Sequence, residues 1–193
     1  QALVQACEPG ALGGCALANI LAGKVNPSAK LPISIPRHSG QIQMIYNHKP
    51  SQYFHKYIDG PSTPLYPFGF GLSYTRFAYS SLKLSHTRIS DKDSFTASIE
   101  LTNVGDREGT EVVQLYIRDI YSSATRPVKE LKDFARVTLK PGEKKTVTFT
   151  VTPDKLAYWN RNMQYGVEKG EFEIMIGSSS QDKDLKKVKM EVL

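Results

Sequence analysis

SFTASIELTNVGDREGTEVVQLYIRD, residues 94–119, decides the fold of this sequence. Apolar and polar residues alternate from Phe95 to Leu101 and again from Val113 to Ile117. A period of two residues is typical of a strand with one buried and one solvated face. Gly105-Asp106 between the two runs is a turn signal. We therefore predict two strands joined by a turn.

The same alternation recurs through the second half of the chain. Further runs end at Leu84, Leu139, Val151, Ile176 and Val192. Turn signals at Pro141-Gly142 and Lys169-Gly170 separate some of them. About seven short strands in roughly 115 residues is the pattern of an immunoglobulin-like or fibronectin type III-like β-sandwich. The fold class is therefore predicted to be mainly β, with this sandwich over residues 77–193.

The first 36 residues are unlike the rest. ALGGCALANILAG, within a helix predicted over 10–22, has roughly helical apolar spacing, with Pro9 in its first turn and Gly23 at its C-terminal cap. KLPISIP then alternates as a strand over 31–35. One helix and one strand need a sheet to pack on, so residues 1–36 are predicted to be the remnant of a larger domain. The Gly13-Gly14 pair implies close approach of a neighbour.

Residues 37–76 are predicted to be a connector between the two parts, because they show little regular pattern. Gly69 and Gly71 do not suit a phosphate-binding loop, since no strand precedes them and no helix follows. The aromatic residues of this stretch are interpreted as anchors that dock the connector on its neighbours. They are Tyr46, Tyr53, Phe54, Tyr57, Tyr66, Phe68, Phe70 and Tyr74.

Composition and charge argue against several classes of function. The net charge of +6 over 193 residues is scattered, and the densest group, near Lys187 and Lys189, resembles the solvated face of an edge strand. No nucleic-acid partner is therefore predicted. No run approaches the length of a membrane span. Cys7 and Cys15 are predicted to be free, buried thiols.

No catalytic, cofactor-binding or metal-binding residue is predicted. His38, His48, His55 and His86 lack the spacing of a metal site, and Ser39 lacks the setting of a hydrolase nucleophile. Glu8 is interpreted as a helix cap and Asp59 as a turn residue rather than a substrate contact. Tyr158, Trp159 and Tyr165 fit either a sugar-stacking platform or a plug inside the sandwich, and the plug is favoured.

The chain resembles glycoside hydrolase family 3, and its β-glucosidases in particular, through separate motifs in order. They are CEPGALGGCALANILAGKVNPSAKLPISIPR (7–37), PRHSGQIQMIYNHKPS (36–51), TPLYPFGFGLSYTRFAYSSLKLS (63–85), LTNVGDREGTEVVQLYIRD (101–119), RPVKELKDFARVTLKPGEKKTVTFTV (126–151) and GEFEIMIGSSS (170–180). The resemblance implies a barrel domain and an α/β sandwich domain upstream, to which this chain would dock. It also implies a retaining mechanism with an aspartate nucleophile and a glutamate acid/base, both outside this sequence.

On this resemblance the chain is expected to be an inactive C-terminal fragment of a β-glucosidase, whose carbohydrate substrate binds the upstream domains. A periplasmic or secreted location is usual for similar enzymes. The alternative is a non-catalytic carbohydrate-binding or adhesive β-sandwich module, favoured by the aromatic residues around Trp159.

Overall fold

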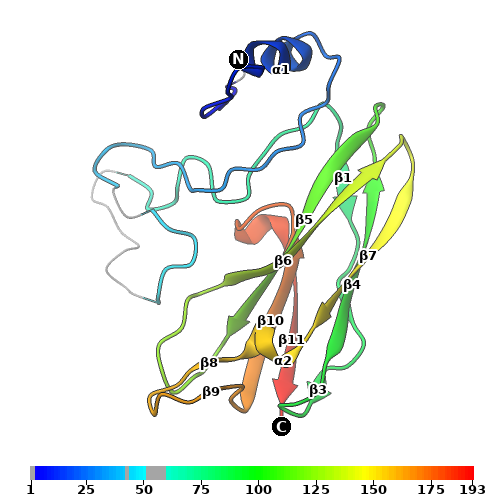
Figure 1. The fold of residues 1–193 in the computed structure, drawn as a ribbon. Helices are drawn as coiled ribbons and strands as arrows, with labels where there is room; N and C mark the ends of the chain where they lie inside the picture. The colour runs from blue at the N-terminus through cyan, green and yellow to red at the C-terminus, as the bar shows by residue number, and fades with distance from the viewer. Residues whose placement is uncertain (1–2, 42–43, 51–59) are drawn as a thin grey trace.

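The quoted stretch forms the centres of two different sheets. In the computed structural model, which describes residues 3–41, 44–50 and 60–193, β4 (Phe95–Asn103) lies in one sheet and β5 (Gly109–Asp119) in the other. β4 pairs with β7 (Lys144–Val151) on one side and with the short strands β1 (Phe77–Tyr79) and β2 (Lys83–Leu84) on the other. Figure 1 shows this sheet beside the second one.

The second sheet is larger. Its order is β3 (Arg88–Ile89), β11 (Leu185–Val192), β10 (Gly170–Gly177), β5 and β6 (Glu130–Leu139). Its pairs are antiparallel apart from β3, which runs parallel to β11 over two residues. The basic strand β11 is therefore bordered by β3 only at its C-terminal end. Two one-turn helices, α2 (Pro153–Leu156) and η2 (Asp182–Asp184), lie in the connections.

The core lies between the two sheets and follows the predicted alternation. β4 buries every second residue from Phe95 to Asn103, and β5 buries Val113, Leu115 and Ile117 towards the same core. Among the described residues, seven strands are three or more residues long, as expected for the sandwich. The mainly β fold is thereby confirmed.

The helix and strand predicted before residue 36 differ from the structure. α1 (Gly13–Leu21) begins later than expected, so Pro9 precedes it, while Gly23 does cap its end with a positive φ of 70°. A side chain at Gly13 would collide with Pro9, which explains one of the two glycines from within the chain. The strand predicted over 31–35 is wrong. Ile35 forms only an isolated bridge to Tyr66, because a strand needs a partner along its length.

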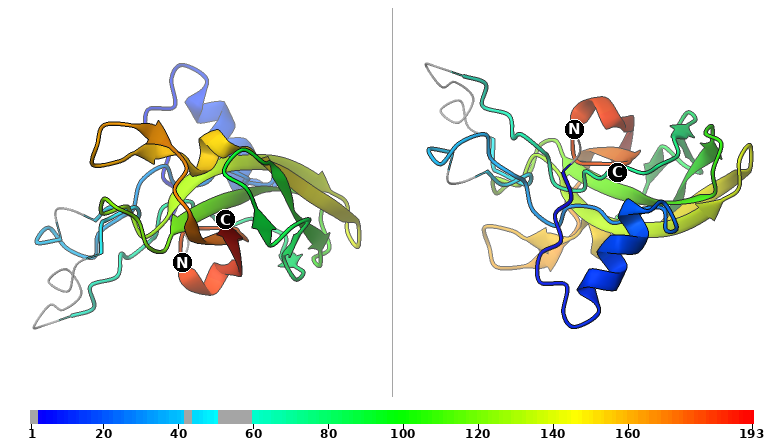
Figure 2. Two further views of the ribbon diagram at one scale, coloured as in Figure 1. Left: turned by 90° about the horizontal axis from the view of Figure 1, so that it is seen from below. Right: turned by 90° about the horizontal axis from the view of Figure 1, so that it is seen from above.

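α1 stands apart from the sandwich, and the connector runs between them (Figures 1 and 2). Cys15 on this helix and Cys7 before it are free, as expected, but both are exposed, so the prediction of buried thiols is wrong for the chain as it stands. Leu12 and Leu21 are also exposed, at 78% and 72%. The apolar surface of this segment is therefore not covered by the sandwich.

Two phenylalanines of the larger sheet are predicted to contribute very differently to the free energy of unfolding. Phe172 on β10 is 1% exposed, whereas Phe134 on β6 is 60% exposed. We expect Phe172→Ala to lower the free energy of unfolding by about 3–5 kcal/mol, because it leaves a cavity. The matched control Phe134→Ala should change it by less than about 0.5 kcal/mol. Chemical denaturation measures both, and similar losses would contradict this assignment of the core.

Candidate functional site

The outer face of β5 is covered by the connector. Tyr46 and Phe68 stack with ring centroids 4.1 Å apart, and Tyr46 meets the edge of the buried Tyr116 at 5.9 Å. Tyr116 packs with Met175 and Leu185 to form a second apolar cluster outside the main core. The prediction that connector aromatics are docking anchors is thus confirmed for Tyr46 and Phe68. Tyr53, Phe54, Tyr57 and Asp59 lie outside the described residues.

Gln114, on the outer face of β5, binds the connector through a hydrogen bond to Gly69. Its amide nitrogen donates to the carbonyls of Gly69 (3.1 Å) and Ser178 (2.8 Å), and its oxygen accepts from the Tyr116 hydroxyl at 2.5 Å. Gly69 has a φ of 77°, and a side chain there would overlap the Gln114 amide. Gly69 is therefore required both by its conformation and by this close approach.

Asn26 joins three separate parts of the chain. Its amide oxygen accepts from the Ser73 hydroxyl and the Tyr74 backbone, both at 2.8 Å, and its nitrogen donates to the Glu108 carbonyl at 2.9 Å. The Tyr74 hydroxyl donates to the carbonyl of Ile20 in α1 at 2.7 Å. The end of the helix, the end of the connector and the turn between β4 and β5 are thereby fastened together.

A buried ion pair completes this attachment. Lys30 Nζ lies 2.7 Å from Glu111 Oε1 at the end of β5, with both side chains largely buried. Burial raises the pKa of Glu111, and the neighbouring ammonium of Lys30 opposes that rise. Removing either partner would leave a buried charge without compensation. Asn26, Lys30 and Gln114 were not predicted, because polar residues in loops and strands are usually solvated.

A cavity of about 840 Å³ lies between the connector and the outer face of β5 and β10. Charged side chains line it, and Lys129 and Lys187 both pair with Asp182, at 2.7 Å and 3.0 Å. Lys129 also donates to the Ser180 carbonyl. These two ammonium groups therefore share one carboxylate at the rim of the cavity.

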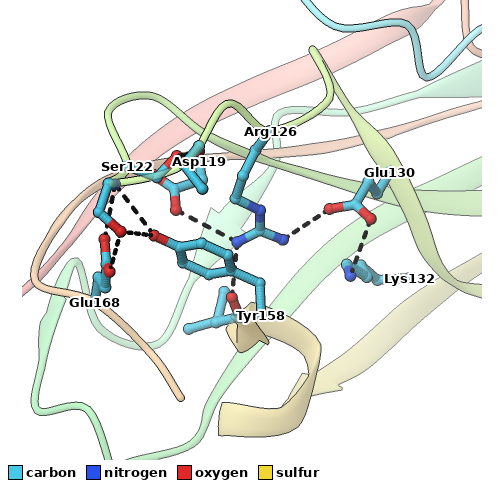
Figure 3. A network of polar contacts seen from close by, with 10 residues as sticks. Asp119, Ser122, Arg126, Glu130, Lys132, Tyr158 and Glu168 are labelled. Carbon is cyan, nitrogen blue, oxygen red and sulfur yellow. Dashed lines mark hydrogen bonds and ion pairs between the residues drawn. The ribbon is translucent and has the colours of Figure 1, made fainter. Parts of the chain in front are cut away.

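A polar network anchors a small hairpin at one end of the sandwich, as Figure 3 shows. The hairpin consists of β8 (Tyr158–Trp159) and β9 (Tyr165–Gly166). Buried Arg126 donates to Asp119 (3.3 Å), Glu130 (2.7 Å) and the Leu156 carbonyl (2.9 Å). Its guanidinium carbon lies 4.6 Å from the centre of the Tyr158 ring, within the range of a cation–π contact.

The other end of Tyr158 is held by hydrogen bonds. Its hydroxyl lies 3.1 Å from the Ser123 hydroxyl, and Ser123 donates through its side chain and its backbone to Glu168 at 2.6 Å and 2.9 Å. The Ser123 hydroxyl, followed by Tyr158, holds the pKa of Glu168 below its ordinary value. Burial, followed by the Glu168 hydrogen bond, raises the pKa of Tyr158. Tyr158 is thus held by Arg126 at the face of its ring and by Ser123 at its hydroxyl.

The neighbouring aromatic residues of the hairpin point into solvent. Trp159 is 61% exposed and Tyr165 55% exposed, and their ring centroids lie 5.4 Å apart with a 51° tilt. The prediction that they plug the sandwich is wrong. Trp159 and Tyr165 are partners in the pairing of β8 with β9, and neither belongs to the core between the two sheets.

The remaining candidates form no reactive arrangement. His38 Nδ1 accepts from the Gly40 backbone at 3.2 Å, within a turn that contains Ser39. The N-cap position of α1 is occupied by Leu12, with no side-chain cap hydrogen bond, and Glu8 lies outside the helix, so the prediction that it caps the helix is wrong. In the described part of the chain, no three His, Cys, Asp or Glu side chains are grouped to hold a metal ion. None of the described helices is long and apolar enough to cross a membrane.

The Gly69 contact predicts how tightly the connector is attached. Gly69→Ala introduces a side chain at positive φ against Gln114, so we expect the connector to detach and the unfolding free energy to fall by more than about 1 kcal/mol. Gly60→Ala is the control, because a side chain there meets no atom within 4 Å. Limited proteolysis of the connector measures the effect. Equal protection in both variants would contradict it.

The Glu168 hydrogen bonds predict a pH dependence of the hairpin. A folded-state pKa below the unfolded value adds stability that is complete above about pH 4.3 and is lost as the pH falls through the folded-state pKa. We expect the fluorescence of Trp159, the single tryptophan, to change in that acidic range. Glu168→Gln should abolish this transition, and its persistence in that variant would assign it to another group.

Comparisons with known proteins agree with this geometry. The model of the glycosyl hydrolase family 3 C-terminal domain matches residues 1–74, and that of the fibronectin type III-like domain matches residues 111–180. A periplasmic β-glucosidase of Salmonella typhimurium is 46% identical over 189 residues, which cover 93% of this chain and 25% of that protein. A β-xylosidase of Formosa agariphila is also 46% identical, over 95% of this chain and 26% of its own length.

A solved structure shares the fold as well as the sequence. The β-glucosidase of Erythrobacter marinus superposes with a TM-score of 0.89 at 44% identity, covering 94% of this chain and 24% of that one. The chain therefore spans about a quarter of the length of the proteins it matches. By its match to the C-terminal domain of glycosyl hydrolase family 3, followed along the chain by a fibronectin type III-like domain, and by this structural agreement, the chain belongs to glycosyl hydrolase family 3 and corresponds to the C-terminal portion of its members.

Proposed function

We propose that this chain is the C-terminal accessory part of a retaining β-glycosidase that hydrolyses terminal β-D-glucosyl residues. The observation that carries the proposal is the match of two family domains, in order, along one chain. Relatives from Salmonella typhimurium and Acetivibrio thermocellus are named β-glucosidase, which supports a β-glucoside as the substrate. The nucleophile and the acid/base, which such a mechanism places about 5 to 5.5 Å apart, are assigned to residues outside this chain.

The role assigned to the chain is structural. Residues 1–36 belong to the α/β domain, residues 37–76 connect, and residues 77–193 form the sandwich. The Asn26 hydrogen bonds, the Lys30–Glu111 ion pair and the Gln114 contact to Gly69 support this division, since they hold the last segment of one domain rigidly against the next. The exposed leucines of α1 are the surface that docks on the rest of the α/β domain.

The choice of sugar is assigned to the upstream domains. A β-xylosidase and a β-glucosidase are equally identical to this chain over nearly the same length. Because one C-terminal part serves enzymes named for two sugars, the side chains that separate glucose from xylose are expected elsewhere.

The proposal predicts that the 193-residue chain releases no p-nitrophenol from p-nitrophenyl β-glucoside. The Salmonella β-glucosidase serves as the positive control, and a polypeptide several times heavier than 21.5 kDa is expected when the native protein is immunoblotted. Saturable turnover by the chain alone would overturn the assignment of the catalytic carboxylates. A native mass near 21.5 kDa would overturn the assignment to a larger enzyme.

A further inference from the structure

The β8–β9 hairpin carries aromatic surface that the attachment of the two domains does not use. It projects from the end of the sandwich opposite to α1 (Figure 1). Trp159 and Tyr165 expose more than half of their surface there, and Met163 at the tip is 75% exposed. Among the described residues, the contacts of Tyr74, Gln114 and Lys30 that fasten the connector do not involve this hairpin.

The hairpin backbone that carries these rings is anchored to the sandwich and closed by hydrogen bonds of its own. Tyr158, next to Trp159, is fixed by Arg126 at its face and by Ser123 at its hydroxyl. Within the tip, the Asn160 side chain accepts from the backbone of Asn162 (2.9 Å) and Gln164 (3.1 Å). A hairpin whose backbone is already ordered loses less conformational entropy when a ligand binds to its side chains.

The tip is closed by an unusual backbone conformation. Met163 has a φ of 57°, and its backbone nitrogen donates to the Asn160 carbonyl at 3.1 Å. A non-glycine residue at positive φ is uncommon and persists only where the surrounding structure requires it. The rings are therefore presented by a defined turn.

The chemistry of the patch suits a sugar. The face of an aromatic ring is electronegative, and the axial C–H groups of a β-glucopyranose or β-xylopyranose form an apolar, weakly positive face that packs on it. Arg161, Asn162 and Gln164, which are exposed in the same hairpin between Trp159 and Tyr165, carry groups that can hydrogen-bond to hydroxyls.

The size of the patch favours a sugar over a protein. A fully covered aromatic side chain buries about 150–250 Å², so the exposed parts of the two rings come to about 200 Å². Specific protein interfaces bury about 800 Å² on each partner. The two rings match the face of one or two sugar units, and their 51° tilt prevents a longer flat platform.

We propose that Trp159 and Tyr165 form a binding site for a β-linked gluco- or xylo-oligosaccharide. One pyranose stacks on Trp159, and Tyr165 contacts its edge. The site holds substrate chains near the enzyme without taking part in hydrolysis. It deepens the proposed function by giving the sandwich a carbohydrate ligand, but binding by this chain does not depend on the catalytic residues.

The test uses Trp159 itself as the probe. The 193-residue chain is titrated with cellotetraose and xylotetraose, and we expect a saturable change of tryptophan emission with a Kd of about 1 mM. Tyr165→Ala should weaken binding about tenfold, as expected for the loss of a stacking ring.

Calorimetric titration extends the test to Trp159→Ala, for which we expect no measurable binding. Phe134→Ala is the matched control, because it removes an equally exposed aromatic ring from another part of the sandwich. Circular dichroism checks that each variant folds, and Trp159→Phe, which keeps a ring, should retain weak binding.

Several results would overturn the proposal. One is the absence of saturable change with either oligosaccharide, and another is binding that survives the Trp159→Ala and Tyr165→Ala changes together. Self-association that Trp159→Ala abolishes would instead assign the patch to a protein contact. A failed titration together with aryl-glucosidase activity of the longer polypeptide would remove this site and leave the proposed function intact.

Discussion

Burial of β5 on both faces is the constraint on which the rest of the structure depends. Its inner face packs Val113, Leu115 and Ile117 into the sandwich core, and its outer face packs Tyr116 under the connector. In a strand that is covered on both faces, each buried polar side chain needs a hydrogen-bond partner. Gln114 does so, because its amide satisfies two backbone carbonyls and the Tyr116 hydroxyl. The connector is thus part of the sandwich's packing rather than a loose link.

This double burial explains how the connector is held against the sandwich. A flexible linker would let the two parts move independently. Here the Lys30–Glu111 pair and the Asn26 hydrogen bonds carry the end of α1 onto the tip of β5 and the turn before it. Buried ion pairs of this kind contribute little net stability, but breaking one is costly. Their effect is to specify one arrangement of the segments.

The opposite end of the sandwich is held by the buried guanidinium of Arg126. Arg126 is buried, yet two carboxylates, a backbone carbonyl and the face of Tyr158 surround its charge. Burial raises the pKa of Asp119 and the charge of Arg126 opposes that rise, so the pair lies where desolvation and attraction compete. The result is an anchored hairpin whose outward rings remain open to a ligand.

The sequence by itself determined the sandwich, because an alternation of two residues gives each of β4, β5, β7, β10 and β11 an apolar face that must be buried between two sheets. It also carried the family motifs. Tertiary structure alone decided that Tyr116 and Gln114, on the polar side of the alternation, are buried under a connector that has no periodicity of its own. It likewise decided that Trp159 and Tyr165 are exposed. The local sequence pattern shows only the period at which apolar residues repeat. Whether a strand face is covered, or an aromatic ring is exposed, depends on segments that are far apart in the chain.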